Sequence, residues 1–341
     1  MLVSALSKFG KTSFSPNSFN NKYGVPISLF NLNFDDKYGI FEVGMDKKGE
    51  IKNLTNIIKP DIGIITNISY AHAKNFKSIK EIALAKSEII QNINKGGSVV
   101  LNADDSFFNL HKKIAQKNDI KIHSFSTRKN IANIRLENIK KKQSKFELCI
   151  VINNKKKYFL TSNNFENNIK NLLAALATIS IFKDLSNIDK NIFYNSKTPK
   201  GRGDISKIKI GKKNIFLIDE SYNANPLSME SAINNFDSIN IQKNKKHLIL
   251  GDMLELGKHS KRLHKAISHN INYSSIDKVH IFGKHIKETY QNIYKKKKGV
   301  VFKESLEIID LIKNYINNND YIMIKGSNST GLNTLTESLK K

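Results

Sequence analysis

Residues 41–90 read FEVGMDKKGEIKNLTNIIKPDIGIITNISYAHAKNFKSIKEIALAKSEII and alternate strand-like with helix-like segments. The overlapping run YGIFEVG (38–44) and the run DIGIITNI (61–68) are short, apolar and rich in β-branched residues, so both predict buried strands. The segment SIKEIALAKSEIIQNI (78–93) has apolar residues at helical spacing and predicts one helix, closed by Gly96 and Gly97. Strands that alternate with helices indicate an α/β fold with mainly parallel sheets.

The same alternation continues along the rest of the chain. Next come a strand with a turn, a meander of three strands and a helix, predicted at 98–105, 131–139, 146–152, 156–161 and 165–182. Pro and Gly cluster in TPKGRGD (198–204), so we expect one domain over 1–199 and a second, Rossmann-like α/β domain over 200–341. The second domain has five predicted strands separated by helices and a last helix from about 330, with the strands at 214–219, 246–251, 277–282, 299–302 and 320–324.

The net charge of +26 raises the question of a nucleic-acid partner. Almost all of the positive charge is lysine, because arginine occurs only at 128, 135, 202 and 262. Proteins that read DNA or RNA usually add arginine for bidentate contacts or aromatic residues for stacking. The heavy use of Lys, Asn and Ile matches A/T-rich codons, so we interpret the charge as a solvated surface and expect no nucleic-acid partner.

The composition also predicts a cytoplasmic protein. No apolar run approaches the ~20 residues that a membrane-spanning helix needs, and the start, MLVSALSKFG, lacks the basic region of a signal peptide. Cys149 is the only cysteine, which excludes an internal disulfide. It lies in the alternating run FELCIVI, where we expect a small buried hydrophobic residue rather than a reactive thiol.

The tetrapeptide Gly10-Lys11-Thr12-Ser13 imitates the end of a phosphate-binding loop. Such a loop needs a glycine five residues earlier, a strand before it and a helix after it. Here Ala5 occupies the glycine position, residues 1–9 predict the end of an amphipathic helix, and SFSPNSFNN cannot begin a helix promptly. We therefore do not expect this segment to bind phosphate.

Three polar residues follow or flank the predicted strands and the first long helix. Glu42 ends a strand, where a carboxylate can hold Mg²⁺. His72 follows the next strand in TNISYAHAKNF, and Lys86 lies in the helical ALAKSEI. Each residue alone is weak evidence, since strand ends often carry carboxylates and helices often carry solvated lysines.

Their order and spacing, however, closely resemble the central domain of the Mur ligase family, and NNKYGVPISL (20–29) resembles the segment after that domain's phosphate loop. The resemblance implies that Glu42 and His72 bind Mg²⁺ and that Lys86 is carbamylated, with Lys86, His72 and Arg202 serving catalysis. A carbamate would turn a cationic amine into an anionic oxygen ligand, whereas an unmodified ammonium would repel the metal.

Motifs further along the chain resemble the branch of this family that adds D-Ala-D-Ala. NNFENNIKNLLAALA (163–177), Gly201-Arg202 and IDESYNANPLSMESAI (218–233) match its nucleotide-binding segments, with LGDMLELG (250–257) and IKGSNST (324–330) at the expected spacing. By resemblance, the residues that bind ATP are Asn168, Arg202, Asp219, Tyr222 and Asn223, and those that bind substrate are Asn225, Lys325 and Ser327.

The resemblance implies an ATP-dependent amide ligase of peptidoglycan synthesis, which uses Mg²⁺ and joins D-Ala-D-Ala to UDP-MurNAc-tripeptide as a monomer. The family's UDP-binding domain and phosphate loop would precede Met1, so we expect the 341-residue chain alone to be inactive or severely impaired. The alternatives are another amino-acid-adding Mur enzyme, a folylpolyglutamate-type ligase, and a non-catalytic nucleotide- or nucleic-acid-binding remnant.

Overall fold

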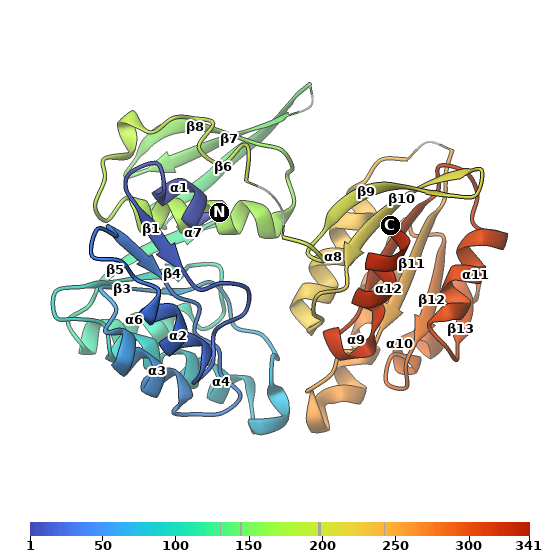
Figure 1. Cartoon of the computed structure of the whole chain (residues 1–341), viewed down its shortest axis with the longest axis horizontal. Helices are drawn as coiled ribbons and strands as arrows, with labels where there is room; N and C mark the ends of the chain where they lie inside the picture. Colours follow the sequence, from blue (N-terminus) through green and yellow to red (C-terminus); the bar gives the residue numbers. More distant parts are fainter. Residues whose placement is uncertain (130, 144, 197–198, 242) are drawn as a thin grey trace. The chain divides into compact units, whose positions relative to one another are not determined.

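The computed structural model describes residues 1–129, 131–143, 145–196, 199–241 and 243–341. The chain divides into two compact units, which are described separately below (Figure 1). The first consists of Met1–Ile68 and Asn75–Lys197, and the second of Ser69–Lys74 and Thr198–Lys341. Within the described ranges, no helix combines the length and the apolar character needed to cross a membrane.

The first unit is built on a six-stranded sheet in the order β3-β4-β5-β6-β7-β8. Strands β3 to β6 are parallel, and β6, β7 and β8 form an antiparallel meander. A separate parallel pair, β1-β2, lies nearer the N-terminus. The strands are β1 (Thr12–Phe14), β2 (Tyr38–Ile40), β3 (Ile62–Ile65), β4 (Ser98–Asn102), β5 (Lys121–Ser126), β6 (Ile134–Lys142), β7 (Lys145–Ile152) and β8 (Lys155–Thr161).

Helix α7 organises the core of this unit because one face of it is apolar along its whole length. Its buried residues, among them Leu172, Leu173 and Leu176, pack against Phe125 of β5 and Leu148 of β7. Burying one such side chain contributes about 1.5–3 kcal/mol. The helices of the unit are α1 (Leu2–Leu6), α2 (Gly24–Phe30), α3 (Glu50–Ile58), α4 (Ile79–Lys86), α5 (Glu88–Gln91), α6 (Phe108–Lys117), α7 (Glu166–Ile179) and η2 (Leu185–Asn187), and the short η1 (Ala73–Asn75) begins in the segment that groups with the second unit.

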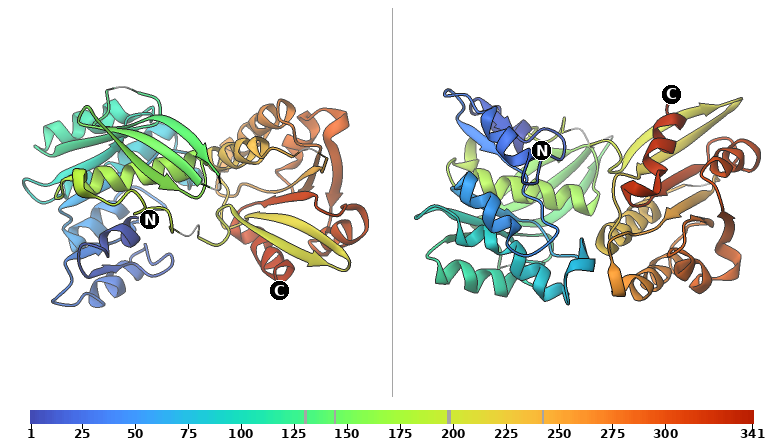
Figure 2. Two further views of the ribbon diagram at one scale, coloured as in Figure 1. Left: turned by 90° about the horizontal axis from the view of Figure 1, so that it is seen from above. Right: turned by 60° about the horizontal axis from the view of Figure 1, so that its bottom comes forward.

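The second unit has a six-stranded sheet in the order β13-β12-β11-β14-β10-β9, in which only β9 is antiparallel. Helices α8 and α9 cover one face and α11 and α12 the other (Figure 2). Its strands are β9 (Asp204–Ile210), β10 (Lys213–Glu220), β11 (Lys246–Gly251), β12 (Lys278–Phe282), β13 (Lys298–Phe302) and β14 (Tyr321–Lys325). Its helices are α8 (Pro226–Ser238), η3 (Gly257–His259), α9 (Ser260–Asn272), α10 (Lys287–Asn292), η4 (Lys295–Lys297), α11 (Leu306–Tyr315), η5 (Asn328–Thr330) and α12 (Leu332–Leu339).

The structure confirms the α/β class with mainly parallel sheets, but it corrects two local predictions. The strand expected over 38–44 is only the half-buried β2, paired with β1 rather than placed in the main sheet. The single helix expected over 78–93 is split at Ser87, whose hydroxyl donates to the carbonyl of Leu84. A serine that bonds backwards in this way competes with the helical hydrogen-bond pattern.

Several lysines of the second unit hold backbone carbonyls at the ends of helices. Lys213 donates to the carbonyls of Lys313 and Ile316 near the end of α11, at 2.8 Å each. Lys297 donates at 2.7 Å to the carbonyls of Ser274 and Ile276, just after α9. Because helix C-termini expose unpaired carbonyls of negative partial charge, the ammonium of Lys213 stabilises the end of α11. The ammonium of Lys297 satisfies two carbonyls of the loop between α9 and β12. Part of the chain's positive charge is therefore structural.

Candidate functional site

The strand ends of the second unit bring three of the sequence motifs to one edge of the sheet. Glu220 at the end of β10 is paired in register with Lys325 at the end of β14, and Lys325 is paired with Leu250 of β11. The loops that follow are therefore neighbours, and they contain SYNANP, GDMLELG and GSNST. Ligands of open parallel sheets bind at such carboxyl edges.

Lys325 is buried at this edge of the sheet, and its ammonium contacts other groups of the protein. Its ammonium donates to the carbonyl of Asn223 at 3.0 Å and lies 3.4 Å from both the carbonyl and the carboxylate of Glu220. Burial lowers the pKa of Lys325, and the Glu220 charge opposes that shift. Burial likewise raises the pKa of Glu220, against the opposing charges of Lys325 and Arg202. Lys325 thus holds the turn after β10, which supports a positioning role, while its direct contact with substrate stays a prediction.

Arg202 is exposed, and its guanidinium stacks on the ring of Tyr222 at 4.5 Å from the centroid. The two residues meet because two turns pack closely: the Tyr222 amide donates to the carbonyl of Gly201 at 3.1 Å. Gly201 has a φ of +71°, and a Cβ there would lie 3.0 Å from Tyr222. Only glycine fits this approach, so the turn presents a planar fork of donors suited to phosphate.

Asp219 is buried at the same edge, and both of its oxygens have protein partners. One accepts from the amide and hydroxyl of Ser221 at 3.0 and 2.5 Å, and the other from Lys340 at 2.7 Å. Burial raises the pKa of Asp219, but the hydrogen bonds from Lys340 and Ser221 outweigh burial and leave it lowered. A ribose contact by Asp219 remains a prediction, whereas Glu220, one residue on, is a carboxylate beside Arg202 that the sequence interpretation did not select.

Three other predicted residues shape the loops of this edge. Asn225 is the N-cap of α8 and accepts from the Ser228 amide at 2.9 Å in a capping box. Asn223 accepts from the next amide at 2.7 Å. Ser327 accepts from the Leu254 amide at 2.9 Å and so joins two loops. The structure therefore brings Asn223, Asn225 and Ser327 to one place, with side-chain oxygens already engaged.

In the first unit, Lys86 ends α4 and is enclosed near two carboxylates. Burial lowers the pKa of Lys86, and the charges of Asp105 and Glu42 act against that shift. Glu42 accepts from Asn20 at 2.8 Å, and Asp105 accepts from the Ile68 amide at 2.7 Å. The structure therefore brings together the predicted pair, Glu42 and Lys86, and adds Asp105. Carboxylate oxygens are the ligands that Mg²⁺ prefers, so this donor set fits the ion.

His72 belongs to the short segment that groups with the second unit. Its Nδ1 lies 2.6 Å from a carboxylate oxygen of Glu255, a residue of the motif LGDMLELG. His72 and Glu255 have φ angles of +55° and +63°, in a region that costs non-glycine residues energy. A carboxylate that engages one ring nitrogen orients the other toward a metal. Convergence of His72 with Glu42 and Lys86 stays a prediction.

Asn168 lies in the first turn of α7, far along the chain from Lys86. Its side-chain amide donates to the hydroxyl of Thr161 at 2.9 Å and approaches the Asn163 carbonyl at 3.4 Å. This contact fixes the amide plane between the end of β8 and the start of α7. The nucleoside role of Asn168 remains a prediction that this fixed geometry supports.

Comparison with known proteins identifies the family of the chain. Family models for the Mur ligase middle domain and for the Mur ligase glutamate ligase domain match residues 1–179 and 207–328. The chain belongs to the Mur ligase family. A UDP-N-acetylmuramoyl-tripeptide–D-alanyl-D-alanine ligase of Buchnera aphidicola subsp. Baizongia pistaciae is 35% identical to this Mur ligase chain, over 100% of the chain and 72% of the relative.

Solved structures agree with the family assignment. MurF from Acinetobacter baumannii has a TM-score of 0.87 at 25% identity, covering 99% of this chain and 72% of the other. A MurF ligase from Thermotoga maritima, solved in complex with ADP, has a TM-score of 0.85 at 20% identity and covers 99% and 75%. The α/β class and the Mur ligase resemblance inferred from the sequence are thereby confirmed.

The region around Gly10-Lys11-Thr12-Ser13 does not have the architecture of a phosphate loop in this Mur ligase. Helix α1 precedes the tetrapeptide and strand β1 begins within it at Thr12, so the helix comes before the strand, the reverse of the required order. Lys11 instead pairs with Asp35 at 2.7 Å. The order of helix and strand expected here from the sequence is therefore observed, and the absence of phosphate binding stays a prediction.

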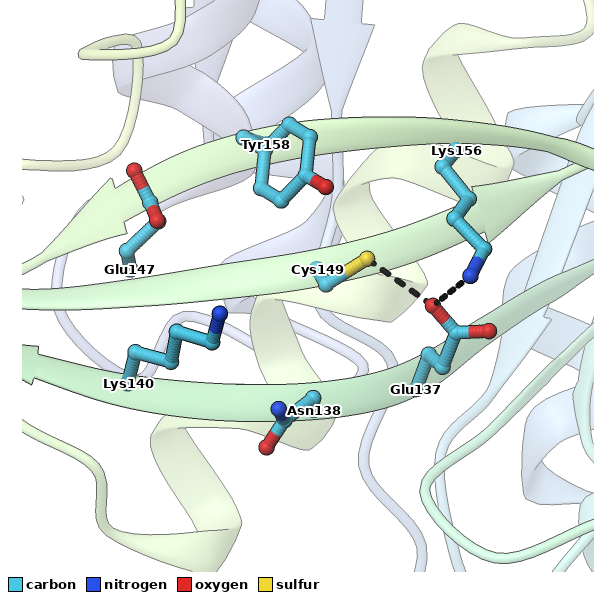
Figure 3. Close-up of a pocket in the computed structure, with 7 residues that line it drawn as sticks. All are labelled: Glu137, Asn138, Lys140, Glu147, Cys149, Lys156 and Tyr158. Carbon is cyan, nitrogen blue, oxygen red and sulfur yellow. Dashed lines mark hydrogen bonds and ion pairs between the residues drawn. The ribbon is translucent and has the colours of Figure 1, made fainter.

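A hollow over β6, β7 and β8 lies on a different part of the first unit (Figure 3). Cys149 donates to Glu137 at 3.1 Å, and Lys156 pairs with the same carboxylate at 2.9 Å. Burial, first, and the Glu137 contact raise the pKa of the Cys149 thiol. Cys149 is buried as predicted, and it has the environment of an unreactive thiol.

Proposed function

We propose that this Mur ligase joins D-Ala-D-Ala to UDP-MurNAc-tripeptide in a reaction coupled to ATP cleavage. The observation that carries the proposal is the strand-end edge of the second unit, where the dipeptide-adding motifs IDESYNANP, LGDMLELG and KGS meet. Relatives named for that reaction match the chain over almost its whole length, as the Buchnera enzyme does over 100% of it.

The proposed chemistry has two steps. The carboxylate of the tripeptide attacks the γ-phosphorus of ATP, so that an acyl phosphate forms and ADP leaves. The amine of D-Ala-D-Ala then attacks the acyl carbon, loses a proton and expels phosphate through a tetrahedral intermediate. Negative charge develops in both steps, so cationic groups fixed in advance lower both barriers.

In this proposal the first unit binds the metal and carries the carbamate. Because burial lowers the pKa of Lys86, a larger share of the amine is uncharged and can add to CO₂. The resulting carbamate would stand near the carboxylates of Glu42 and Asp105, so the three anions repel unless divalent cations lie between them. Bound Mg²⁺ would supply charge neutralisation for the phosphoryl oxygens.

The second unit supplies the nucleotide contacts in this proposal. Arg202, displayed by its glycine turn and stacked on Tyr222, would bind the phosphates. The buried carboxylate of Asp219 would reach the ribose only by exchanging a protein partner, and Glu220 offers a second carboxylate at the same strand end. Asn168 of the first unit would contact the adenine.

The test is ligation of D-Ala-D-Ala to UDP-MurNAc-tripeptide with Mg-ATP, followed by mass spectrometry of the product and by phosphate release. It is run on a fusion of the chain with the part of the Buchnera relative that the chain does not cover. The fusion should form the pentapeptide product. A fusion that folds, yet neither forms product nor binds ADP, would refute the proposal.

The same assay separates the competing functions. Another Mur enzyme or a folylpolyglutamate-type ligase would prefer a single amino acid, such as glutamate, over D-Ala-D-Ala as the acceptor. A nucleic-acid-binding remnant would instead bind RNA or DNA tightly, with an affinity that falls steeply as salt rises. We expect neither result.

Arg202→Ala tests the nucleotide contact directly. Loss of a charge-assisted hydrogen bond to phosphate should weaken ADP binding by about 10- to 100-fold, measured by isothermal titration calorimetry. Arg262→Ala is the matched control, because Arg262 also stacks on a tyrosine, Tyr70, at 5.7 Å. Equal ADP affinity in both variants would remove Arg202 from the site.

A further inference from the structure

Lys340, which follows α12, binds two carboxylates at the edge of the second sheet. Its ammonium lies 2.6 Å from Asp204 and 2.7 Å from Asp219. These two aspartates face each other across the antiparallel pair β9–β10. Like charges directly opposite each other on neighbouring strands repel. The positive charge of Lys340 offsets this repulsion, and its two ion pairs bridge the two strands.

The bridge extends to the turn that displays Arg202. The other carboxylate oxygen of Asp204 accepts from the Gly201 amide at 2.8 Å. The Gly203 amide donates to the carbonyl of Asp219 at 2.7 Å. Both ends of the turn are therefore hydrogen-bonded to one of these two aspartates. Gly203 has a φ of +96°, and the turn therefore depends on external contacts for its shape.

The turn that contains Ser221 and Tyr222 is also hydrogen-bonded to this pair of aspartates. Asp219 accepts from the Ser221 hydroxyl at 2.5 Å, and the next residue, Tyr222, donates its amide to the carbonyl of Gly201 at 3.1 Å. The contact between the Arg202 guanidinium and the Tyr222 ring consequently joins two turns. Both turns depend on the aspartates that the ammonium of Lys340 holds together. The side chain of Asp219 is 4% exposed, whereas those of Lys340 and Asp204 are 21% and 24% exposed.

We propose that Lys340 is a positioning residue for the nucleotide: it holds Asp204 and Asp219 together and thereby fixes the turns that present Arg202 and Tyr222. The inference rests on the proposed function of this edge as the nucleotide site. Lys340 itself does not touch the ligand. Its loss lets the two carboxylates separate, frees the Gly201 amide and allows Arg202 to sample positions that miss the phosphates.

The test compares Lys340→Met with Lys341→Met, the exposed lysine beside it. ADP affinity should fall by about tenfold in Lys340→Met, the amount of a typical charge-assisted hydrogen bond, and stay unchanged in Lys341→Met. Lys340→Arg, which can also bridge two carboxylates, should recover most of the affinity. An unchanged ADP affinity in Lys340→Met would overturn the proposal.

A double-mutant cycle with Arg202→Ala distinguishes positioning from general stability. If Lys340 acts through Arg202, the loss of ADP affinity caused by Lys340→Met disappears in the Arg202→Ala background. Fully additive losses would overturn the proposal. Should Lys340→Met fail to fold, Asp204→Ala, which keeps the pair of Lys340 and Asp219, gives the same readouts.

Hydrogen exchange separates failure of this inference from failure of the proposed function. A wild-type fusion that does not bind ADP would count against the proposed function. Independently of ADP, the amides of residues 200–204 should exchange faster in Lys340→Met than in Lys341→Met, measured by mass spectrometry of the peptide. Identical exchange in the two variants would overturn the positioning role of Lys340 whatever ADP does.

Discussion

Two enclosed lysines lie at strand or helix ends in the two units, and their surroundings differ. Burial lowers the pKa of both Lys86 and Lys325. Lys325 donates to the Asn223 carbonyl and lies beside Glu220, so its ammonium is satisfied by the fold. In the part of the chain that the structure describes, Lys86 is compensated by the charges of Asp105 and Glu42 without a hydrogen bond from its ammonium. From this difference we predict that Lys325 acts as a structural cation and that Lys86 is an amine available for chemistry.

Replacement of Lys86 should have the largest effect, a loss of ligation activity. In the fusion described above, Lys86→Met should lower the ligation rate by about 10²–10³-fold, the amount typical for a lost electrostatic contribution to a transition state. The variant should remain folded, because methionine fills the volume of the lysine stem. Wild-type protein in ¹³C-bicarbonate should show a carbamate signal in the ¹³C spectrum.

The carbamate signal should be absent from Lys86→Met and present in Lys325→Met. A wild-type spectrum without a carbamate signal, together with full activity of Lys86→Met, would remove the distinction between the two lysines.

Replacement of Lys325 should act on stability first. Lys325→Met leaves the enclosed Glu220 carboxylate without its cation and the Asn223 carbonyl without its donor, so unfolding free energy should fall by about 3 kcal/mol, measured by urea denaturation. Lys142→Met is the control: Lys142 pairs with Glu147 at the surface and is 57% exposed. The control should change stability by less than about 0.5 kcal/mol.

If Lys325→Met is as stable as Lys142→Met but loses substrate affinity, Lys325 is a substrate ligand and not a structural cation.

The second unit also contains a buried histidine pair away from the ligand edge. The Val300 amide donates to His280 Nδ1 at 3.1 Å, so the proton of this ring is on Nε2, which faces His247 Nδ1 at 3.2 Å. His247 Nε2 in turn faces Asp320 at 3.7 Å. Burial, first, and the neighbouring charges lower the pKa of His280 to about 3. Both rings are therefore neutral in the folded chain at neutral pH.

This pair predicts a moderate pH dependence of stability. The unfolded chain takes up the proton near pH 6.5 and the folded one only near pH 3, so stability is full above 6.5 and declines as the pH falls. Between pH 7.5 and 5.5 the loss should be about 1.4 kcal/mol by urea denaturation. His280→Gln should have a flatter profile than the wild type, and the exposed His269→Gln should keep the wild-type profile. A flat profile in the wild type would contradict the assignment.

Much of the second unit could be predicted because its parallel strands are buried and read as continuous apolar runs. The five strands predicted there match β10 to β14 closely. Strand β9 was missed, although DISKIKI alternates apolar and polar residues as an antiparallel edge strand does. Strand β5 and helix α6 were also missed, between more strongly patterned segments.

The site could be predicted less completely than the fold. Glu42 and Lys86 share an electrostatic environment, but Asp105 was overlooked even though NADD follows a buried strand, which is a recognisable signal. Lys340 had no such signal, since a lysine after a helix is usually solvated. Its role follows only from tertiary contacts that bring Asp204 and Asp219 to opposite positions on neighbouring strands. Long-range pairing of this kind leaves no periodic trace in the sequence.

The order Asp219-Glu220 at the end of β10 also helps to fix the register of this strand. Neighbouring residues on a strand point to opposite faces, and here the shorter acid meets Lys340 while the longer one meets Lys325. A slip by one position would put Glu220 or Ile218 in the place of Asp219 and, correspondingly, Ser221 or Asp219 in the place of Glu220, so one of the two ammonium groups would lose its carboxylate. The two acids therefore specify which way the strand faces, before any nucleotide arrives.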